Sequence, residues 1–112
     1  LDINLLNTGR HFRINKYTKL ILGRNKEENE RLHSLWVPPY ALVYPIGFSG
    51  PLGIIKGGPE REIIAIVANI ISYYGKNKAS MITIELNNGS LFRNEVRRTD
   101  QDFEQYKIWE TQ

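Results

Sequence analysis

The sequence has no cysteine, one methionine and only two histidines, His11 and His33, among its 112 residues. Without cysteine the chain cannot form disulfides, thiolate zinc sites, iron–sulfur clusters or a thiol nucleophile. Neither histidine has a paired carboxylate at a spacing typical of a catalytic triad or a metal site. These absences argue against an enzyme and against a bound metal or cofactor, so we expect a non-catalytic domain.

Long apolar runs are missing too. No stretch approaches the length of a membrane-spanning helix, and no basic segment is followed by an apolar one as in a signal peptide, so we expect a cytoplasmic protein. A chain with 41% hydrophobic residues can bury one modest core. We therefore expect a single domain over residues 1–112, with its core at about 10–98 and an acidic, aromatic tail at 99–112. The initial Leu1 suggests a domain excised from a larger protein.

Positive charge is concentrated at the N-terminal end, although the net charge is only +3. Up to residue 26 the chain has a single acid, Asp2, and six basic residues: Arg10, Arg13, Lys16, Lys19, Arg24 and Lys26. Acids gather at residues 27–30 and from residue 100 onward. This segregation favours a basic face that meets phosphate groups. The alternative is a basic hairpin that is only solvated, which would show the same pattern.

Alternation of apolar and polar residues predicts a β-hairpin near the N-terminus. In its first strand Phe12 and Ile14 point to one side. His11 and Arg13 point to the other side, where they would form a wet, basic face. Further elements are expected at residues 19–23 (the second strand), 26–35 (a short helix that ends before two prolines), 40–44 and 52–55 (strands).

The clearest element is a helix at residues 59–74. Pro59 suits its first turn, and Gly75 is placed to end it. Its apolar residues recur with a period of 3.6 and should pack on the sheet: Ile63, Ile66, Val67, Ile70, Ile71 and Tyr74.

A second hairpin is expected from residues 81–86 and 91–97, and its register follows from the character of its two faces. A two-residue Asn-Gly turn would mix core and solvent residues on one face. A shift by one residue pairs Leu86 with Phe92 and gives a coherent inner face, which favours a three-residue loop with a glycine bulge. The predicted fold class is α+β: a mainly antiparallel sheet of hairpins with one long packed helix and one short helix.

Residues 23–32 read Gly-Arg-Asn-Lys-Glu-Glu-Asn-Glu-Arg-Leu and join a strand to the short helix. Asn25 is predicted to cap this helix, with Glu28 at the reciprocal position of a capping box. Asn29 falls on the same helical face as Leu32. Its amide should therefore be partly buried and should hold a neighbouring loop.

The order of these motifs resembles the RNA-binding domain of the NFACT proteins, in particular a version attached to tRNA thiouridylase-like enzymes. In that family an apolar strand runs into Gly-Arg-Asn, then a second Asn and Leu, as in residues 23–32 here. The family's long helix ends in Tyr-Tyr-Ser-Lys, and this chain has Tyr-Tyr-Gly-Lys at 73–76. The Arg-His-Phe-Arg strand at 10–13 looks like the thiouridylase-linked subgroup. The family's Trp-x-His and Gly-Ser-His segments have no full counterpart, so no role of those histidines carries over.

The resemblance implies a module that binds tRNA or another structured RNA, within a tRNA-modifying parent whose ATP-using catalytic domain lies upstream. The residues expected to contact RNA are Arg10, His11, Arg13, Lys16, Lys19, Arg24, Asn25, Asn29, Arg97 and Arg98. The alternative is a protein-interaction or dimerisation module that docks on the parent's catalytic domain. Its contacts would come from Tyr40, Phe48 and the aromatic tail with Phe103, Tyr106 and Trp109, whereas Trp36 is expected in the core.

Overall fold

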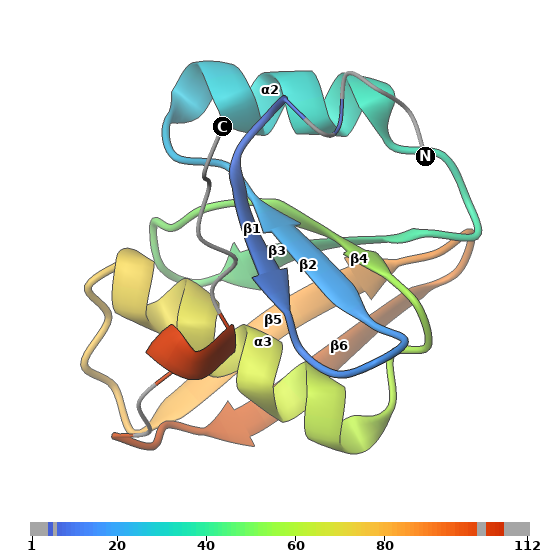
Figure 1. The fold of residues 1–112 in the computed structure, drawn as a ribbon. Helices are drawn as coiled ribbons and strands as arrows, with labels where there is room; N and C mark the ends of the chain where they lie inside the picture. Colours follow the sequence, from blue (N-terminus) through green and yellow to red (C-terminus); the bar gives the residue numbers. More distant parts are fainter. Residues whose placement is uncertain (1–4, 6, 101–102, 107–112) are drawn as a thin grey trace.

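The computed structural model describes residues 5, 7–100 and 103–106, and it shows one six-stranded antiparallel sheet with a helix on each face (Figure 1). The strands are β1 (Arg10–Arg13), β2 (Lys19–Leu22), β3 (Ala41–Ile46), β4 (Gly53–Lys56), β5 (Met81–Asn87) and β6 (Leu91–Arg97). The helices are α2 (Lys26–Leu35), α3 (Arg61–Tyr74) and the 3-10 turn η1 (Glu104–Tyr106). The strand order is β1-β2-β4-β3-β5-β6. The predicted α+β class is confirmed.

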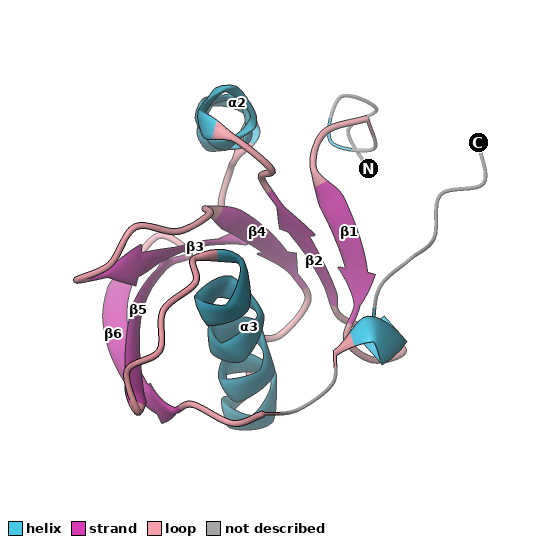
Figure 2. Ribbon diagram, turned by 90° about the vertical axis from the view of Figure 1, so that its left-hand side faces the viewer, coloured by secondary structure: helices cyan, strands magenta, loops and turns pink. Residues whose placement is uncertain are grey.

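The long helix α3 packs on one face of the sheet, which curves around it (Figure 2). Four aliphatic side chains of its predicted stripe are buried: Ile63, Val67, Ile70 and Ile71. They meet the inward residues of the strands, among them Phe12 and Leu20, and each buried aliphatic side chain stabilises the fold by about 1.5 to 3 kcal/mol. The core therefore lies between α3 and the concave face of the sheet.

The short helix α2 lies on the opposite face, over β2 and β4 (Figure 2). Leu32 is its one fully buried residue, and it packs with Ile21, Leu42 and Ile54 from three neighbouring strands. Because α2 spans only ten residues, it covers part of this face. The apolar cluster around Leu32 does not include the basic residues at the ends of β1, β2 and β4: Arg13, Lys19 and Lys56.

The β5–β6 hairpin has the register that the sequence predicts. Leu86 pairs with Phe92 and Ile84 with Asn94, and the loop at residues 88–90 contains Gly89 at a φ of 110°. Phe92 is nevertheless 40% exposed, because β6 is an edge strand at the margin of the core.

The aromatic residues assigned to a core or docking role have mixed positions. Trp36 is partly buried on the α2 side and donates its indole N–H to the Tyr40 carbonyl oxygen at 2.7 Å. Phe48, Phe103 and Tyr106 are partly buried against the main core, and Trp109 lies outside the described residues. Within the described part of the chain, no helix is long and apolar enough to cross a membrane.

Candidate nucleic-acid interface

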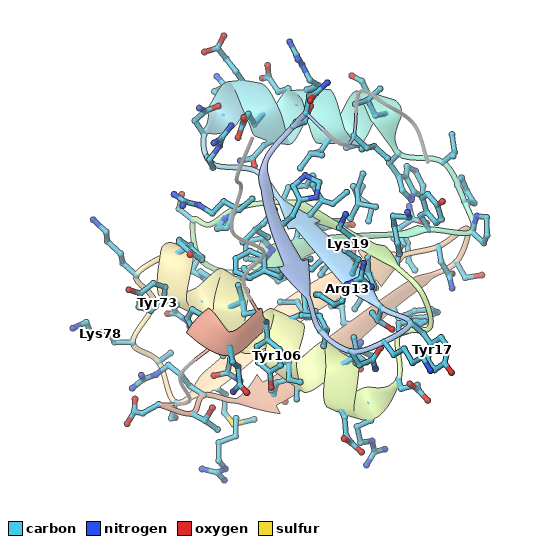
Figure 3. All side chains as sticks on the ribbon, in the orientation of Figure 1. Arg13, Tyr17, Lys19, Tyr73, Lys78 and Tyr106 are labelled. Atoms are coloured by element: carbon cyan, nitrogen blue, oxygen red, sulfur yellow. The ribbon has the colours of Figure 1, made fainter. Side chains whose placement is uncertain are left out.

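Three basic residues stand side by side across three adjacent strands. Arg13 on β1 pairs with Lys19 on β2, and Lys19 pairs with Lys56 on β4. Neighbouring strands lie about 4.8 Å apart, so the three Cα atoms span roughly 10 Å. We call Arg13, Lys19 and Lys56 the cation row. It lies on the face of the sheet that carries α2, and Figure 3 labels its first two members.

The cation row is electrostatically unfavourable by itself. Like charges directly opposite one another on paired strands destabilise a sheet. Burial and then the positive charges of Lys56 and Arg13 lower the pKa of the Lys19 ammonium below its ordinary value. Among the described residues, no acid forms an ion pair with any of the three. An anion bound on the row would relieve this repulsion.

A second row on the same face shows what a balanced arrangement looks like. Tyr44, Glu85 and Arg93 pair across β3, β5 and β6. The Tyr44 hydroxyl donates to Glu85, and Arg93 Nε donates to the same carboxylate at 2.9 Å. Burial and this hydrogen bond raise the pKa of Tyr44 to about 12, so the hydroxyl stays protonated. Within the described part of the chain, the sheet therefore pairs Arg93 with an acid and leaves the cation row without one.

Two exposed or half-buried aromatic rings accompany the cation row. The Lys56 ammonium lies 5.5 Å from the centre of the Tyr40 ring. In the turn between β1 and β2, the Lys16 ammonium lies 5.7 Å from the centre of the Tyr17 ring, which is 79% exposed. The backbone of Gly57, just after β4, lies close against this turn. A Cβ atom on Gly57 would meet the Tyr17 carbonyl oxygen at 2.6 Å. Lys16 and Tyr17 are therefore fixed next to the end of β4.

The structure separates Arg10 from the other residues of the basic hairpin. Arg10 lies on the α3 face of the sheet, where its guanidinium sits 4.7 Å from the centre of the Tyr74 ring. Strand residues alternate between faces, so Arg10 and Arg13 point to opposite sides of β1. They belong to different surfaces of the domain.

The expected exposure of His11 is wrong. Its side chain is buried, with 7% of its surface exposed, and its ring Nε2 lies 3.2 Å from the Thr8 carbonyl oxygen. The prediction of one wet face on the first hairpin failed because α2 and Leu5 cover that face around Ile21. His11 is therefore part of the packing, and only the outer end of the hairpin is wet.

The strand-to-helix connection forms the predicted cap with one change. Asn25 Oδ1 accepts from the Glu28 N–H at 2.9 Å, which confirms the cap. Glu28 does not bond the Asn25 N–H; its carboxylate accepts instead from the Arg24 N–H at 2.9 Å and from the Arg24 guanidinium at 2.6 Å. The guanidinium hydrogen bond is the main reason that the pKa of Glu28 falls to about 2. Arg24 is thus engaged with an acid in the first turn of α2.

Asn29 has the predicted structural role. Its Oδ1 atom accepts from the Leu52 N–H at 3.2 Å, so the amide ties α2 to the loop that enters β4. The side chain is half-buried and faces the protein. The position suits a scaffold residue more than a ligand contact.

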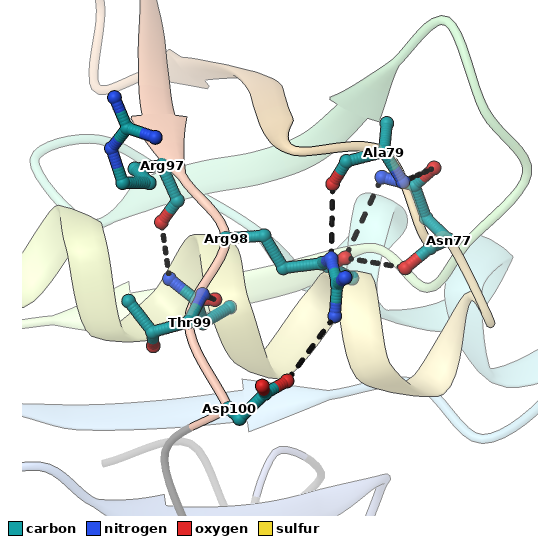
Figure 4. Close-up of polar contacts among 8 residues, drawn as sticks. Asn77, Ala79, Arg97, Arg98, Thr99 and Asp100 are labelled. Atoms are coloured by element: carbon teal, nitrogen blue, oxygen red, sulfur yellow. Dashed lines mark hydrogen bonds and ion pairs between the residues drawn. The ribbon is translucent and has the colours of Figure 1, made fainter.

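Arg97 and Arg98 lie at the end of β6, at the opposite edge of the sheet from β1. Arg98 Nε donates to the Ala79 carbonyl oxygen at 3.0 Å, and its Nη1 lies 3.4 Å from Asp100 (Figure 4). The Arg97 side chain is exposed, and its carbonyl oxygen accepts from the Asn69 amide at 3.3 Å. These two arginines are not neighbours of the cation row.

Of the predicted contact residues, the structure brings together Arg13, Lys16 and Lys19 and adds Lys56, which the sequence analysis did not select. Lys56 is the last residue of the short apolar strand β4, and nothing in the nearby sequence links it to the hairpin. Only the pairing of β2 with β4 places it beside Lys19. Within the described residues, no group of three or more His, Cys, Asp or Glu side chains could hold a metal ion.

Comparison of the sequence with models of protein families identifies the family of this domain. The model of the NFACT protein RNA-binding domain matches residues 9–109 of this chain. The chain belongs to this family. RNA is therefore the partner class of the domain, and the family is non-catalytic. The match includes the cation row, the capped connection and the segment after α3.

The fold is similar to that of a solved structure. It is the C-terminal part of the fibronectin/fibrinogen-binding protein from Streptococcus suis (FBPS), with a TM-score of 0.71 and 15% sequence identity over 90% of this chain. The present chain spans 49% of that structure. At this identity the likeness concerns the fold alone. No curated protein matches the sequence significantly.

Proposed function

We propose that this domain binds tRNA or a similarly structured RNA by docking the phosphate backbone on the cation row. The carrying observation is that Arg13, Lys19 and Lys56 stand directly opposite one another on three strands without an acidic partner among the described residues. Phosphate contacts position a protein on RNA without reading its sequence, and structured RNA is recognised mainly by shape. Lys16 extends the row by one more cation at the hairpin turn.

The aromatic rings next to the cation row support the same function. Tyr17 is largely exposed beside Lys16. Stacking of an unpaired base on such a ring contributes about 1 to 3 kcal/mol of binding free energy. The Tyr40 ring is half-buried, so it contacts the Lys56 ammonium rather than offering a face to a base. An RNA whose backbone crosses the cation row could therefore stack one unpaired base on Tyr17, next to the turn between β1 and β2.

We further propose that the domain serves a tRNA-modifying parent protein of the thiouridylase-like kind, in the cytoplasm. The support is the resemblance of the strand Arg10–Arg13 to that subgroup. In such a protein the module would hold the body of the tRNA while a separate catalytic domain acts on one nucleotide. The sequence of the full-length gene product tests this arrangement, because an upstream ATP-binding catalytic domain is required.

Titration of the domain with unmodified tRNA at several salt concentrations tests the RNA-binding proposal. The logarithm of the binding constant should fall linearly with the logarithm of the salt concentration. Arg13→Ala, Lys19→Ala and Lys56→Ala should each weaken binding and reduce the slope by about one. Lys26→Ala removes an exposed lysine at the start of α2 and should change little.

Two results would overturn the docking surface. Binding that does not depend on salt would exclude phosphate contacts as its basis. Equal losses in Lys26→Ala and in the three row variants would show that general charge, rather than the cation row, attracts the RNA. The measured mass of the free domain in the same buffer tests the protein-interaction alternative, since a tight dimer without RNA affinity would favour it.

A further inference from the structure

A second basic and aromatic surface lies at the C-terminal end of α3. A cleft of about 790 Å³ opens between the end of this helix, the loop that follows it and the segment after β6. Tyr73, Tyr74 and Phe103 form its aromatic wall, with the Tyr73 and Phe103 ring centres 4.8 Å apart. Tyr73 is 64% exposed although its ring contacts those of Tyr74 and Phe103. The cleft thus presents an accessible aromatic surface.

Basic residues surround this aromatic wall. Lys76, Lys78 and Arg98 line the cleft, and both lysines are exposed. Among the described residues that line it, Asp100 is the one acid, and its carboxylate is 98% exposed at 3.4 Å from Arg98. Figure 3 shows Tyr73 and Lys78 on the same side of the molecule. The combination of a ring surface and a positive rim is suited to a nucleotide, which has a flat base and a negative phosphate.

Lys76 is held in a backbone conformation that normally selects glycine. Among the described residues it is the one non-glycine residue with a positive φ, at 55°. The Asn77 N–H donates to the Ser72 carbonyl oxygen at 3.0 Å, so Lys76 occupies the left-handed position of a Schellman motif. Glycine at this position would avoid the strain of the Cβ atom. A lysine here places its charge at the cleft despite a cost in stability.

The preceding Gly75 has a different requirement. A Cβ atom on Gly75 would meet the Ser49 carbonyl oxygen at 2.8 Å, so the residue must be small although its own φ is −84°. The sequence 73–76 therefore combines an exposed ring, a ring that packs inward, a close backbone contact and a strained lysine. This is the Tyr-Tyr-Gly-Lys segment, for which the cation row provides no role.

The edge strand β1 connects the cleft to the cation row. Arg10 at one end of β1 stacks on Tyr74, which lines the cleft, while Arg13 at the other end belongs to the row. Their Cα atoms are about 10 Å apart along the strand. A single RNA backbone could follow this edge and contact both surfaces.

We propose that the cleft binds an unpaired nucleotide of the RNA whose backbone lies on the cation row. The base stacks on Tyr73, and its phosphates contact Lys76 and Lys78. This inference rests on the proposed function, since the row supplies the main affinity for the RNA. It adds a preference for RNA that carries a single-stranded end or bulge next to a helix.

Two RNAs that differ only in an unpaired segment separate the cleft from the cation row. One is a blunt RNA hairpin, and the other is the same hairpin with a short 3′ extension containing 2-aminopurine, whose fluorescence falls on stacking. The wild-type domain should bind the extended RNA about tenfold more tightly and quench the probe. Tyr73→Ala should lose this gain and the quenching without weakening binding of the blunt hairpin. Tyr73→Phe, which keeps the ring, should retain both.

Lys76→Gly is a variant in which weaker RNA binding would not result from a less stable fold. Glycine tolerates the left-handed conformation, so the melting temperature should rise by about 2 to 5 °C. Affinity for the extended RNA should nevertheless fall about threefold because one phosphate contact is lost. A more stable protein with weaker binding would show that Lys76 is present for the ligand.

The outcomes distinguish this inference from the proposed function. Equal affinity of the wild-type domain for both RNAs, or an equal loss for both RNAs in Tyr73→Ala, overturns the nucleotide site while binding of the blunt hairpin upholds the cation row. Unchanged affinity for the extended RNA in Lys76→Gly overturns the assigned role of that lysine. If the wild-type domain binds neither RNA, both proposals fail.

Discussion

The side-chain oxygen of Asn29 occupies the space in which a Cβ atom on Gly23 would lie. That oxygen accepts from the Leu52 N–H at 3.2 Å, and the Gly23 N–H donates to the Leu52 carbonyl oxygen at 2.9 Å. Gly23 and Asn29 therefore meet at one backbone segment, and each requires the identity of the other. This explains physically why a glycine and an asparagine six positions apart occur together in the connection between β2 and α2.

Gly23→Ala should lower the free energy of unfolding by about 2 kcal/mol or more. The new methyl group must displace the Asn29 amide, which leaves the Leu52 N–H without its partner. Urea denaturation measures the change. Gly58→Ala is the matched control because a Cβ atom there meets nothing within 4 Å. Equal stability of the two variants would contradict the steric interpretation.

Asn29→Ala should cost about 1 to 2 kcal/mol of stability, since a half-buried N–H loses its acceptor. Affinity for RNA should stay the same in protein that is fully folded. The double variant Gly23→Ala with Asn29→Ala should be less destabilised than the sum of the two single changes, because the methyl group then has room. Loss of RNA binding at unchanged stability would instead make Asn29 a ligand contact.

Glu28→Gln should make stability depend less on acid pH. The folded-state pKa of Glu28 is about 2, below its ordinary value of 4.5, so its stabilising contribution is complete above pH 4.5 and is lost as the pH falls through 2. The wild-type protein should exceed the variant by about 1 kcal/mol at pH 7, and the difference should shrink between pH 4.5 and 2.

The control for this pH dependence is Glu27→Gln, which removes an exposed acid of the same helical turn. It should change stability by only a few tenths of a kcal/mol, through the helix dipole. Thermal unfolding from pH 2 to 7 compares the three proteins. A difference between wild type and Glu28→Gln that persists at pH 2 would show that the carboxylate charge is not the cause.

Lys19→Met should stabilise the domain while it weakens RNA binding. Methionine keeps an unbranched stem and removes the central charge of the cation row, which should gain about 0.5 kcal/mol at low salt. The pKa of Lys19 is lowered mainly by burial and then by its cationic neighbours, so the wild type loses the unfavourable charge as the pH rises toward 10.5. The stability advantage of the variant should therefore disappear at high pH.

Salt provides a second test of the Lys19 variant. The stability difference should decrease in 1 M salt, because screening weakens the repulsion within the row. Lys26→Met, on the exposed surface of α2, should show neither effect. A destabilised Lys19→Met protein at every salt concentration would indicate that Lys19 contributes packing rather than charge repulsion.

Local chemistry in the sequence predicted much of the fold. Asn25 could be identified as a cap because short polar side chains satisfy the first amides of a helix. The register of the β5–β6 hairpin followed from the alternation of core and solvent residues, with Leu86 opposite Phe92. The end of α3 was located correctly, but its left-handed residue is Lys76 and not Gly75. The close contact with Ser49 that requires Gly75 comes from a segment distant in sequence.

The candidate site was harder to predict because it depends on strand order. Insertion of β4 between β2 and β3 brings Lys56 next to Lys19, and no periodicity within either segment encodes this pairing. The same sheet separates Arg10 from Arg13, although both occur in one basic strand. His11 was misplaced because the cover supplied by α2 is a tertiary contact.

The position of the cation row has a consequence for the energetics of folding. Arg13 lies on the edge strand β1, Lys19 on its neighbour and Lys56 on the next strand inward, so one phosphate chain would brace the outermost hairpin against the interior of the sheet. A ligand that binds only the assembled strands adds its binding free energy to stability. In hydrogen exchange, the amides of the first hairpin would therefore gain the most protection when RNA is bound. Bound RNA would therefore stabilise the edge of the sheet that β1 forms.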